Sequence, residues 1–434
     1  MKNLHLSHLI FCCFSGLALT ACGGGDGGDS SVNDNPPIVD DENEPVDEVV
    51  FEPVIFSNFQ RADFVLTTDD EGADLFSDIY ANPFVSEDGS LWIGDYSANQ
   101  LVRFTTLPES DGVAATYIDS IQYRDGENAV QDYQLLGPSS PVVSAGRMIV
   151  PLYSDNSVVI FDSIPVTGAE NTGIILGTGS FEEEPAADCS ALGISGPEGL
   201  AAAGGKLVVT DSGHNRVLIW NTMPTQSGTL PDIVLGQNSL DHCIANDDNQ
   251  DGDTDSQPSA RTFDVPAGAW TDGEKLLVID STNNRVLVWN TFPTENFEPA
   301  DLVLGQPDFA SNNANDADQD SSEDDPSAQT MNYPFDGIYS NGEQIFVTDG
   351  DNNRVLIWNS WPTENGQAAD VVLGQGSFTN TAANDDNQDD VEDVVGEEYL
   401  STDRTMAYPS GLLLHEKTLI VIDNYNRLMF FSGE

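Results

Sequence analysis

The chain has 434 residues, a length that fits two or three ordinary domains or one long all-β repeat domain. It carries 14 Lys and Arg against 73 Asp and Glu, which gives a formal net charge of -59. This balance excludes DNA, RNA and anionic membrane surfaces as partners, because each requires a basic footprint on the protein. It favours divalent cations or cationic partners, or a solvated acidic surface that keeps the protein soluble.

The first predicted segment is an export signal at residues 1–21. Lys2 supplies its positive end, and Leu9–Leu19 supplies an apolar stretch that is too short to span a bilayer. The end of this segment, Leu-Thr-Ala followed by Cys22, resembles the lipobox of bacterial lipoproteins. The resemblance implies a lipid on Cys22, and Gly23 in second place implies the outer membrane. We therefore expect a cell-envelope protein that meets the membrane only through its lipid; an ordinary secretory signal is the alternative.

Residues 22–52 are rich in Gly, Asp, Asn, Pro and Glu and have few large apolar side chains. Such a segment cannot bury enough surface to fold. We predict a disordered acidic tether that holds the folded part, residues 53–434, off the membrane.

A repeat dominates the folded part. The sequence Asn-Arg-Val-Leu begins at Asn215, Asn284 and Asn353, 69 residues apart each time. A fixed period means that one supersecondary unit is copied along the chain. The unit reads as four short strands, at 196–203, 206–211, 216–221 and 232–236. Further copies lie at 265–305 and 333–374, weaker ones lie earlier at 91–104 and 148–177, and a last copy lies at 408–431.

The sixth copy lacks its fourth strand, and the missing piece lies at the other end of the domain. Ala62–Leu66 matches the fourth strands at Ala300–Leu304 and Ala369–Leu373. Such an exchange makes sense only if the units form a ring. We predict an all-β fold, a six-bladed β-propeller closed by the N-terminal strand, which completes the last blade.

The clear units have Pro-x-Gly in the first strand, with one extra residue in the copy at 333–374, Asp at the end of the second strand and Asn-Arg-Val at the third. This pattern resembles the NHL repeat. In the first copy Gln100 replaces the Arg, and in the second Leu152 and Ser157 replace the Asp and the Arg. The repeated Asp and Arg could form a charged ring on the channel rim, or could pin the loop between the second and third strands through charge-assisted hydrogen bonds. These residues are Asp211, Arg216, Asp280, Arg285, Asp349, Arg354, Asp423 and Arg427.

Three acidic inserts separate the fourth strand of one unit from the first strand of the next, at about 245–260, 314–329 and 383–399. Their oxygen side chains alternate as in the opening of a calcium loop, where short carboxylates converge on a hard cation. They are similar to the Asp-x-Asp-x-Asp-Gly loops of thrombospondin type 3 and dockerin-like modules. Only the first has the Gly, and no Glu stands at the twelfth position. The predicted calcium ligands are Asp247, Asn249, Asp251, Asp253 and Asp255; Asp316, Asp318, Asp320 and Asp324; and Asp385, Asn387, Asp389 and Asp393. Disordered inserts without an ion are the alternative.

Two further cysteines, Cys189 and Cys243, lie in connections of the same kind, before and after one blade. In an oxidising compartment we expect them to form a disulfide; two free buried thiols are the alternative.

The sequence predicts no catalytic residues. His214, His242 and His415 follow the signal segment, and His214 stands at a loop position that the other repeats fill with Asn. Glu198 and Asp336 lie near the start of innermost strands, where they could hold a channel metal as in gluconolactonase-like propellers.

We therefore expect a binding or scaffold module, stabilised by calcium, with an unknown protein or glycan ligand on its acidic face. A metal-dependent hydrolase or lyase of the gluconolactonase or amidating-lyase propeller type is the alternative, and a purely structural envelope protein is a third possibility. Which of them holds depends on the site and not on the fold.

Overall fold

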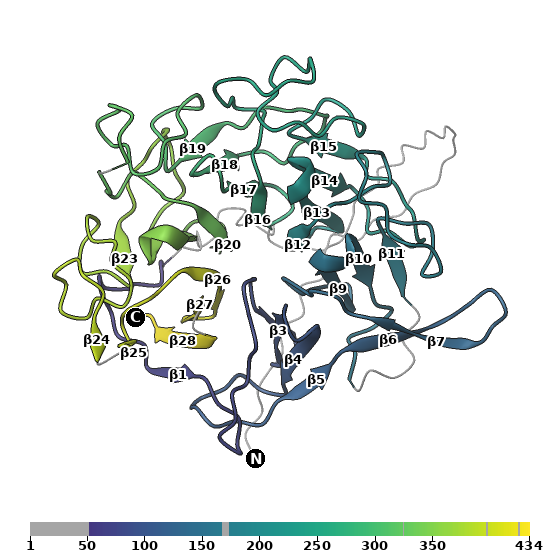
Figure 1. Cartoon of the computed structure of the whole chain (residues 1–434), viewed down its shortest axis with the longest axis horizontal. Coiled ribbons are helices and arrows are strands. Elements are labelled where there is room, and N and C mark those ends of the chain that lie inside the picture. The colour runs from purple at the N-terminus through teal and green to yellow at the C-terminus, as the bar shows by residue number, and fades with distance from the viewer. Residues whose placement is uncertain (1–51, 167–172, 324, 396–397, 424–425) are drawn as a thin grey trace, which may run out of the picture. The chain divides into compact units, whose positions relative to one another are not determined.

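Six four-stranded antiparallel sheets form a ring around a central axis (Figure 1). This computed structural model describes residues 52–434 except 167–172, 324, 396–397 and 424–425. The six four-stranded sheets are counted over these residues. They belong to one compact unit, 52–434. The predicted signal segment, Cys22 and nearly all of the predicted tether lie outside the described residues.

In the first five blades the strands follow the chain from the innermost strand to the outermost. The blades are β2 (Phe84–Val85), β3 (Leu91–Asp95), β4 (Gln100–Phe104) and β5 (Thr116–Ile118); β8 (Val142–Ser144), β9 (Arg147–Leu152), β10 (Ser157–Ile160) and β11 (Ile174–Leu176); β12 (Pro197–Ala203), β13 (Lys206–Asp211), β14 (Arg216–Trp220) and β15 (Ile233–Leu235); β16 (Pro266–Thr271), β17 (Leu276–Asp280), β18 (Arg285–Trp289) and β19 (Leu302–Leu304); and β20 (Pro334–Ser340), β21 (Ile345–Asp349), β22 (Arg354–Trp358) and β23 (Val371–Leu373).

The sixth blade joins the two ends of the described chain. Its sheet has the order β1-β28-β27-β26, built from β26 (Pro409–His415), β27 (Thr418–Asp423), β28 (Arg427–Ser432) and β1 (Phe64–Leu66). In the antiparallel pair of β1 and β28, Val65 lies opposite Met429. The Phe64 ring stacks on the Phe430 ring, with 4.2 Å between centroids. The outermost strand of this blade thus comes from the N-terminal side of the domain.

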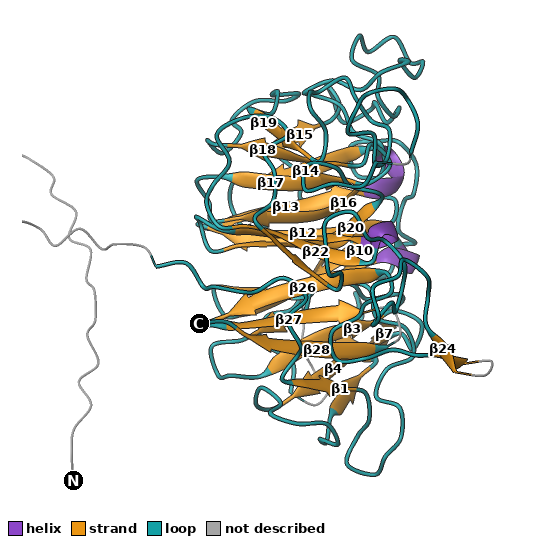
Figure 2. Ribbon diagram, turned by 90° about the vertical axis from the view of Figure 1, so that its left-hand side faces the viewer, coloured by secondary structure: helices purple, strands orange, loops and turns teal. Residues whose placement is uncertain are grey.

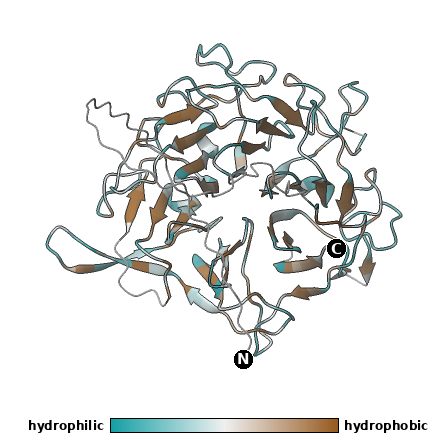
Figure 3. Cartoon of the chain, turned by 180° about the vertical axis from the view of Figure 1, so that it is seen from behind, coloured by the Kyte–Doolittle hydropathy of each residue, from teal (hydrophilic) through white to brown (hydrophobic). Residues whose placement is uncertain are grey.

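The hydrophobic core lies between the blades. Strands are mostly hydrophobic and the loops hydrophilic in Figure 3. Each of the six core clusters combines side chains of two adjacent blades; Ile279 of the fourth blade and Val347 of the fifth, for example, share one. Because both faces of each blade are covered, the strands carry continuous apolar runs instead of alternating ones. The cluster between the sixth and first blades contains Leu66, Leu428 and Leu91, so packing also closes the ring.

Glycine lets the innermost strands approach one another closely. A Cβ on Gly199 would lie 2.1 Å from the carbonyl oxygen of Ala267 in the next blade. A Cβ on Gly268 would lie 2.2 Å from the carbonyl oxygen of Asp336 in the blade after that. The Gly of the Pro-x-Gly pattern is thus required where neighbouring backbones meet around the axis.

Several short elements lie outside the six four-stranded sheets. They are the hairpin of β6 (Ser120–Arg124) and β7 (Val130–Gln134), the hairpin of β24 (Val394–Val395) and β25 (Glu398–Tyr399), and the 3₁₀ turns η1 (Tyr153–Asp155), η2 (Ser212–His214) and η3 (Gly350–Asn352). Figure 2 shows the 3₁₀ turns and β24 on the same side of the ring. No helix in the described part of the chain has the length and apolar character to cross a membrane.

Replacing Leu66 with Ala tests the contribution of β1 to the sixth blade. Leu66 is fully buried, so we expect Leu66→Ala to lower the free energy of unfolding by about 2–5 kcal/mol in urea denaturation. Leu230→Ala is the control, because Leu230 is 47% exposed and should change stability by less than about 0.5 kcal/mol. Equal stabilities of the two variants would show that β1 does not belong to the core.

Candidate functional site

A buried ion pair is repeated at the loop between the second and third strands of four blades. In the fourth blade, Nε of Arg285 lies 2.7 Å from Oδ2 of Asp280, and both side chains are fully buried. The same pair occurs, at 2.6–2.7 Å, in Asp211–Arg216, Asp349–Arg354 and Asp423–Arg427. These side chains are buried, so they are not a charged ring open to ligands on the rim.

In the third, fourth and fifth blades the Arg also ties together the two connections that flank its blade, whereas Arg427 bonds only the connection that enters the sixth blade. Arg285 donates to the Phe309 carbonyl oxygen (2.6 Å) in the connection leaving the blade. It also donates to the carbonyl oxygens of Ser259 and Thr262, at 3.0 Å each, in the connection entering it. The second carboxylate oxygen of Asp280 accepts from the Asp264 N–H. We call this arrangement the Asp–Arg clamp, and it satisfies backbone groups that would otherwise be buried without partners.

The Asn before each Arg joins neighbouring blades. Asn215 has a left-handed backbone (φ 52°) that Asn tolerates better than most residues. Its side-chain oxygen accepts from the Val265 N–H of the next blade at 3.0 Å, and its amide donates to the Cys243 carbonyl oxygen. Asn284 accepts in the same way from the Tyr333 N–H and Asn353 from the Tyr408 N–H. Sequence reasoning gave these residues no role, although their 69-residue spacing is plain.

The two irregular blades replace the clamp. In the first, Asp95 accepts from the backbone N–H groups of Ser77 and Asp78, and Gln100 donates to it only weakly, at 3.4 Å. In the second, Asp155 accepts from the hydroxyls of Ser157 and of Tyr133, which lies on β7. The β6–β7 hairpin thus supplies part of what the missing Arg supplies elsewhere.

The first and third inserts fold onto themselves with the same hydrogen bonds. Asp247 accepts from the N–H groups of Asp251 and Gly252, and Asp385 accepts in the same way from those of Asp389 and Asp390. A second carboxylate closes each loop. In the first insert Asp255 accepts from the Asp248 N–H and the Asn249 side-chain amide. In the third insert Asp393 accepts from the N–H groups of Asp386 and Asn387 and from the Asn387 side-chain amide. Asp253 is exposed.

The second insert differs from the other two because it brings three carboxylate groups close together, as a metal site requires. A carboxylate oxygen of each of Asp316, Asp318 and Asp320 lies within 4.8 Å of the others, the only such group of three among the described residues. Asp316 is 4% exposed, and its Oδ1 has no hydrogen-bond partner among the residues that the structure describes. The other inserts have Asn249 and Asn387 in place of Asp318. Asp324 lies outside the described residues.

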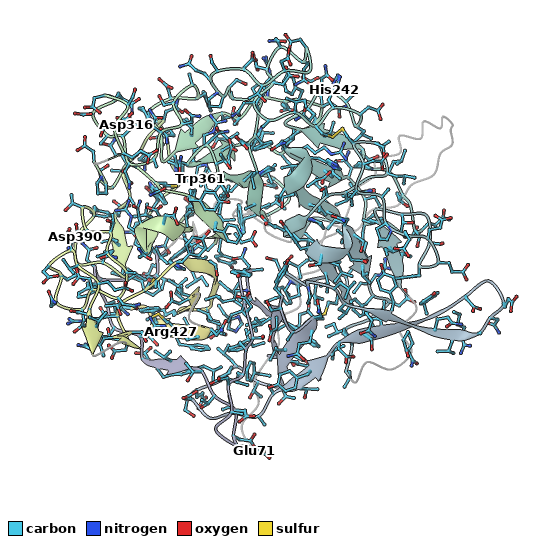
Figure 4. The ribbon with its side chains drawn as sticks, viewed as in Figure 1. Glu71, His242, Asp316, Trp361, Asp390 and Arg427 are labelled. Atoms are coloured by element: carbon cyan, nitrogen blue, oxygen red, sulfur yellow. A yellow bond between two sulfur atoms is a disulfide. The ribbon has the colours of Figure 1, made fainter. Side chains whose placement is uncertain are left out.

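The inserts are anchored on the face that carries the clamps. The buried amides of Asn246 and Asn283 donate to each other, at 3.0 and 2.9 Å, so the first insert is fixed to the corner of the fourth blade. Asn315 and Asn352 form the equivalent pair for the second insert. Asp316 and Asp390, labelled in Figure 4, lie in loops outside the ring of strands. The second and third inserts therefore lie at the outer edge of the ring and do not line its channel.

Cys189 and Cys243 form a disulfide that closes a separation of 54 residues. It links the connections before and after the third blade. His214 lies at the corner of the same blade, 6% exposed, with Nδ1 3.0 Å from Oδ2 of the clamp residue Asp211. These contacts place His214 within the framework of that corner.

A cavity of about 230 Å³ lies at the insert side of the channel, where the innermost strands begin. Four blades contribute to its walls, so it lies near the axis. Its lining residues are Tyr80, Ala81, Tyr96, Pro138, Ser139, Tyr153, Glu198, Phe335 and Asp336. We call it the channel-mouth pocket.

Aromatic rings form a continuous collar around this pocket. Tyr153 contacts Tyr96, Tyr96 contacts Tyr80, and Tyr80 contacts Phe335, with ring centroids 5.7, 5.8 and 6.3 Å apart. All three contacts are edge-to-face, the geometry that the ring quadrupoles favour. Phe335 continues the collar to Tyr408 at 5.9 Å.

Two carboxyl groups face the same pocket. Asp336 is 1% exposed, and its Oδ1 has no hydrogen-bond partner among the described residues. Burial raises its pKa well above the usual range, and the charge of Glu198 raises it further. Burial raises the pKa of Glu198 to about 7, while a weak hydrogen bond from the Ser212 hydroxyl, at 3.3 Å, acts in the opposite direction. The pair can hold protons near neutral pH, bind a cation, or exchange a proton with a ligand.

The Asp–Arg clamp can be tested by removing one guanidinium. Arg285→Ala leaves the Asp280 charge buried without its partner, so we expect the free energy of unfolding in urea to fall by about 3–5 kcal/mol. Arg61→Ala is the control, because Arg61 and its partner Asp403 are 56% and 39% exposed and such a pair contributes less than about 1 kcal/mol. Similar losses in the two variants would contradict the assigned role of the clamp.

One repeat unit matches a known family. Residues 195–220, which run from the start of β12 to the end of β14, match the family described as NHL repeat. No curated protein matches the chain in sequence. A solved structure of a protein of unknown function from Bacteroides thetaiotaomicron is 11% identical, with a TM-score of 0.42, and the match covers 88% of this chain and 75% of that chain.

A catalytically inactive virginiamycin B lyase from Staphylococcus aureus, solved with quinupristin, is also 11% identical, with a TM-score of 0.40, and the match covers 85% of this chain and 99% of that chain. Likenesses of this size carry no argument about what the present chain binds or does. The chain carries an NHL repeat in the third blade of a six-bladed β-propeller.

Proposed function

We propose that this protein is a ligand-binding module of the cell envelope, and that its ligand binds in the channel-mouth pocket. One observation carries the proposal. The pocket combines an aromatic collar with Asp336, a buried carboxyl group whose Oδ1 has no hydrogen-bond partner in the described part of the chain. Few convergent polar groups within an apolar concave wall are typical of small-ligand sites. A scaffold without a ligand would gain nothing from an unpartnered buried carboxyl group.

The location of the protein is part of the proposal and rests on the sequence. A lipid on Cys22 would anchor the chain, and the acidic segment up to residue 52 would act as a tether. A tethered ring can turn its insert-bearing face toward a protein or glycan, and the pocket opens on that face. The membrane is reached only through the lipid in this proposal.

Calcium is proposed as a stabilising ion at the second insert. Its three carboxylates lie close enough to share one cation, and the unpartnered Oδ1 of Asp316 is a buried oxygen available to it. At the first, third and fifth positions the second insert has three carboxylates, whereas the first and third inserts have two, because Asn249 and Asn387 stand where the second has Asp318. The Gly in the first insert is therefore a weaker guide to calcium than the carboxylates at these alternating positions.

A hydrolase or lyase is the second candidate function. The observation that favours it is the raised pKa of Glu198, about 7, because a general acid or base works best near the ambient pH. The described lining of the pocket offers two carboxyl groups and no histidine. A channel metal would therefore have to take most of its ligands from water or substrate, so we favour the binding function.

Fragment binding tests the pocket as a ligand site. Tyr153 forms one end of the collar and is 37% exposed, so its removal should not disturb the core. In ligand-observed NMR with a mixed fragment library, we expect fragments that bind the wild type to bind Tyr153→Ala about tenfold more weakly. Tyr117→Ala, at a 45% exposed tyrosine on β5, should bind them as the wild type does. Equal binding by both variants, or no binding by the wild type, would exclude the pocket as the site.

Calcium binding is tested by making the second insert resemble the other two. We expect millimolar calcium to raise the melting temperature of the wild type, and Asp318→Asn to bind one ion fewer in calorimetry and to show a smaller rise. Glu109→Gln, an exposed neutralisation far from the inserts in sequence, is the matched control. A wild type that binds no calcium at millimolar metal would refute the proposed site.

A further inference from the structure

We propose that the ligand of the channel-mouth pocket is an organic cation with an ammonium group. Its N–H groups would donate to Asp336 and Glu198, and its carbon skeleton would lie against the aromatic collar. This inference rests on the proposed binding function and names the chemical class of the ligand. Four features of the pocket support it: an unpartnered carboxyl group, the charges around it, the collar, and the size of the cavity.

Asp336 lacks what a buried carboxylate requires. It is 1% exposed, and its Oδ1 accepts no hydrogen bond from any described residue. Burying such a group costs free energy unless it is paired and hydrogen-bonded. An ammonium group supplies both, because it carries the opposite charge and up to three N–H donors.

The charges around the pair are all of one sign. The charge of Glu198 helps to raise the pKa of Asp336. No other charged group, positive or negative, contributes to the raised pKa of Asp336 or of Glu198. The other titratable groups that sense the pair are the phenols of Tyr153, Tyr333 and Tyr408, all with raised pKa values. The carboxyl groups of Asp264 and Asp351 in turn act on Tyr333. A cation entering the pocket therefore meets no positive charge from these groups, and it meets a negative potential once the pair ionises.

The collar suits the organic part of such a ligand. The rings of Tyr153, Tyr96, Tyr80 and Phe335 follow one another at 5.7–6.3 Å between centroids. Aromatic faces attract ammonium groups and also cover methylene or aromatic carbon. The collar is thus complementary to the apolar part of an amphipathic amine, and the two carboxyl groups are complementary to its ammonium group.

A bare divalent ion fits the same pocket less well. Calcium takes six to eight oxygen ligands and magnesium six. The polar side chains in the lining, besides the tyrosines, are Glu198, Asp336 and Ser139, and the Ser139 hydroxyl already donates to the Glu198 carbonyl oxygen at 2.8 Å. The cavity of about 230 Å³ would hold several waters at roughly 30 Å³ each, so an ion alone would leave it mostly filled with solvent.

The proposal predicts a direction of pH dependence. At pH values below the raised pKa values the pair is protonated, and it then offers a cation little charge. The affinity for an amine should therefore rise as the pH increases through about 7, the pKa of Glu198, and beyond as Asp336 ionises. Binding should release protons, since the cation replaces them on the carboxylates.

Calorimetry with matched probes tests the inference on the full chain. Benzylamine and benzyl alcohol have similar size and shape, but only benzylamine is positively charged near neutral pH. We expect the wild type to bind benzylamine at least about tenfold more tightly than benzyl alcohol. We expect the affinity for benzylamine to rise between about pH 6 and about pH 8, with proton release seen as a dependence of the heat on the buffer.

Asp336→Asn should abolish the preference for benzylamine while still binding benzyl alcohol. Its melting temperature near neutral pH should be little changed, because the raised pKa keeps Asp336 largely protonated in the empty protein and Asn is a neutral side chain of similar shape. Glu198→Gln serves as a second variant, and Glu87→Gln, at an exposed carboxylate, as the control that retains the preference.

The outcomes separate this inference from the proposed function. Equal affinities for the two probes would overturn the cation but leave the binding site in place. Calcium binding that Asp336→Asn abolishes, without benzylamine binding, would replace the organic cation by a metal. Binding of neither probe would overturn the inference, and the fragments that depend on Tyr153 would then decide the binding function independently.

Discussion

The Asp–Arg clamp is the interaction on which one whole face of the ring depends. Long connections between blades carry many backbone carbonyl groups that no strand can pair. Arg285, Arg216 and Arg354 each use one guanidinium for a carboxylate and for carbonyl groups of two connections at once. Removing these groups from water is tolerable only because they are all satisfied together. The three inserts are held in place by connections that begin and end at these clamps.

The architecture could be predicted from the sequence because the same four-strand pattern occurs in several copies. Strands expected at 206–211 and 216–221 occur as β13 and β14 with bounds that differ by one residue at most. The β6–β7 and β24–β25 hairpins were not predicted, because neither is part of the repeated unit. Their strands are short, and a single copy gives no period to detect.

The candidate site was harder to predict, because its residues break the repeat. Glu198, Ala267 and Ser410 occupy the same position between Pro and Gly in three blades, and the fifth blade has Phe335 and Asp336 there, one residue more. No spacing therefore marks the two carboxyl groups as a pair. The collar joins loops of several blades, since Tyr80 and Tyr96 belong to the first blade, Tyr153 to the second and Phe335 to the fifth, and the ring brings these blades together. The repeated residues thus predict the fold, whereas the candidate site consists of residues that differ from one copy of the repeat to the next.

Two buried aspartates show how the fold distinguishes structure from function. Asp280 and Asp336 are equally removed from solvent. The repeat provides Asp280 with Arg285 five positions later, together with the Asn283 amide and a backbone N–H group. It provides Asp336 with no cation among the described residues, and the charge that acts on it is another carboxyl group, Glu198. Burial without a partner costs several kcal/mol, roughly, in the charged form, or leaves the group protonated with a raised pKa. The chain pairs the clamp carboxylates with Arg in four blades, so it has the means to avoid this penalty, and the two carboxyl groups of the pocket that lack a cation are best explained by a partner that arrives from solution.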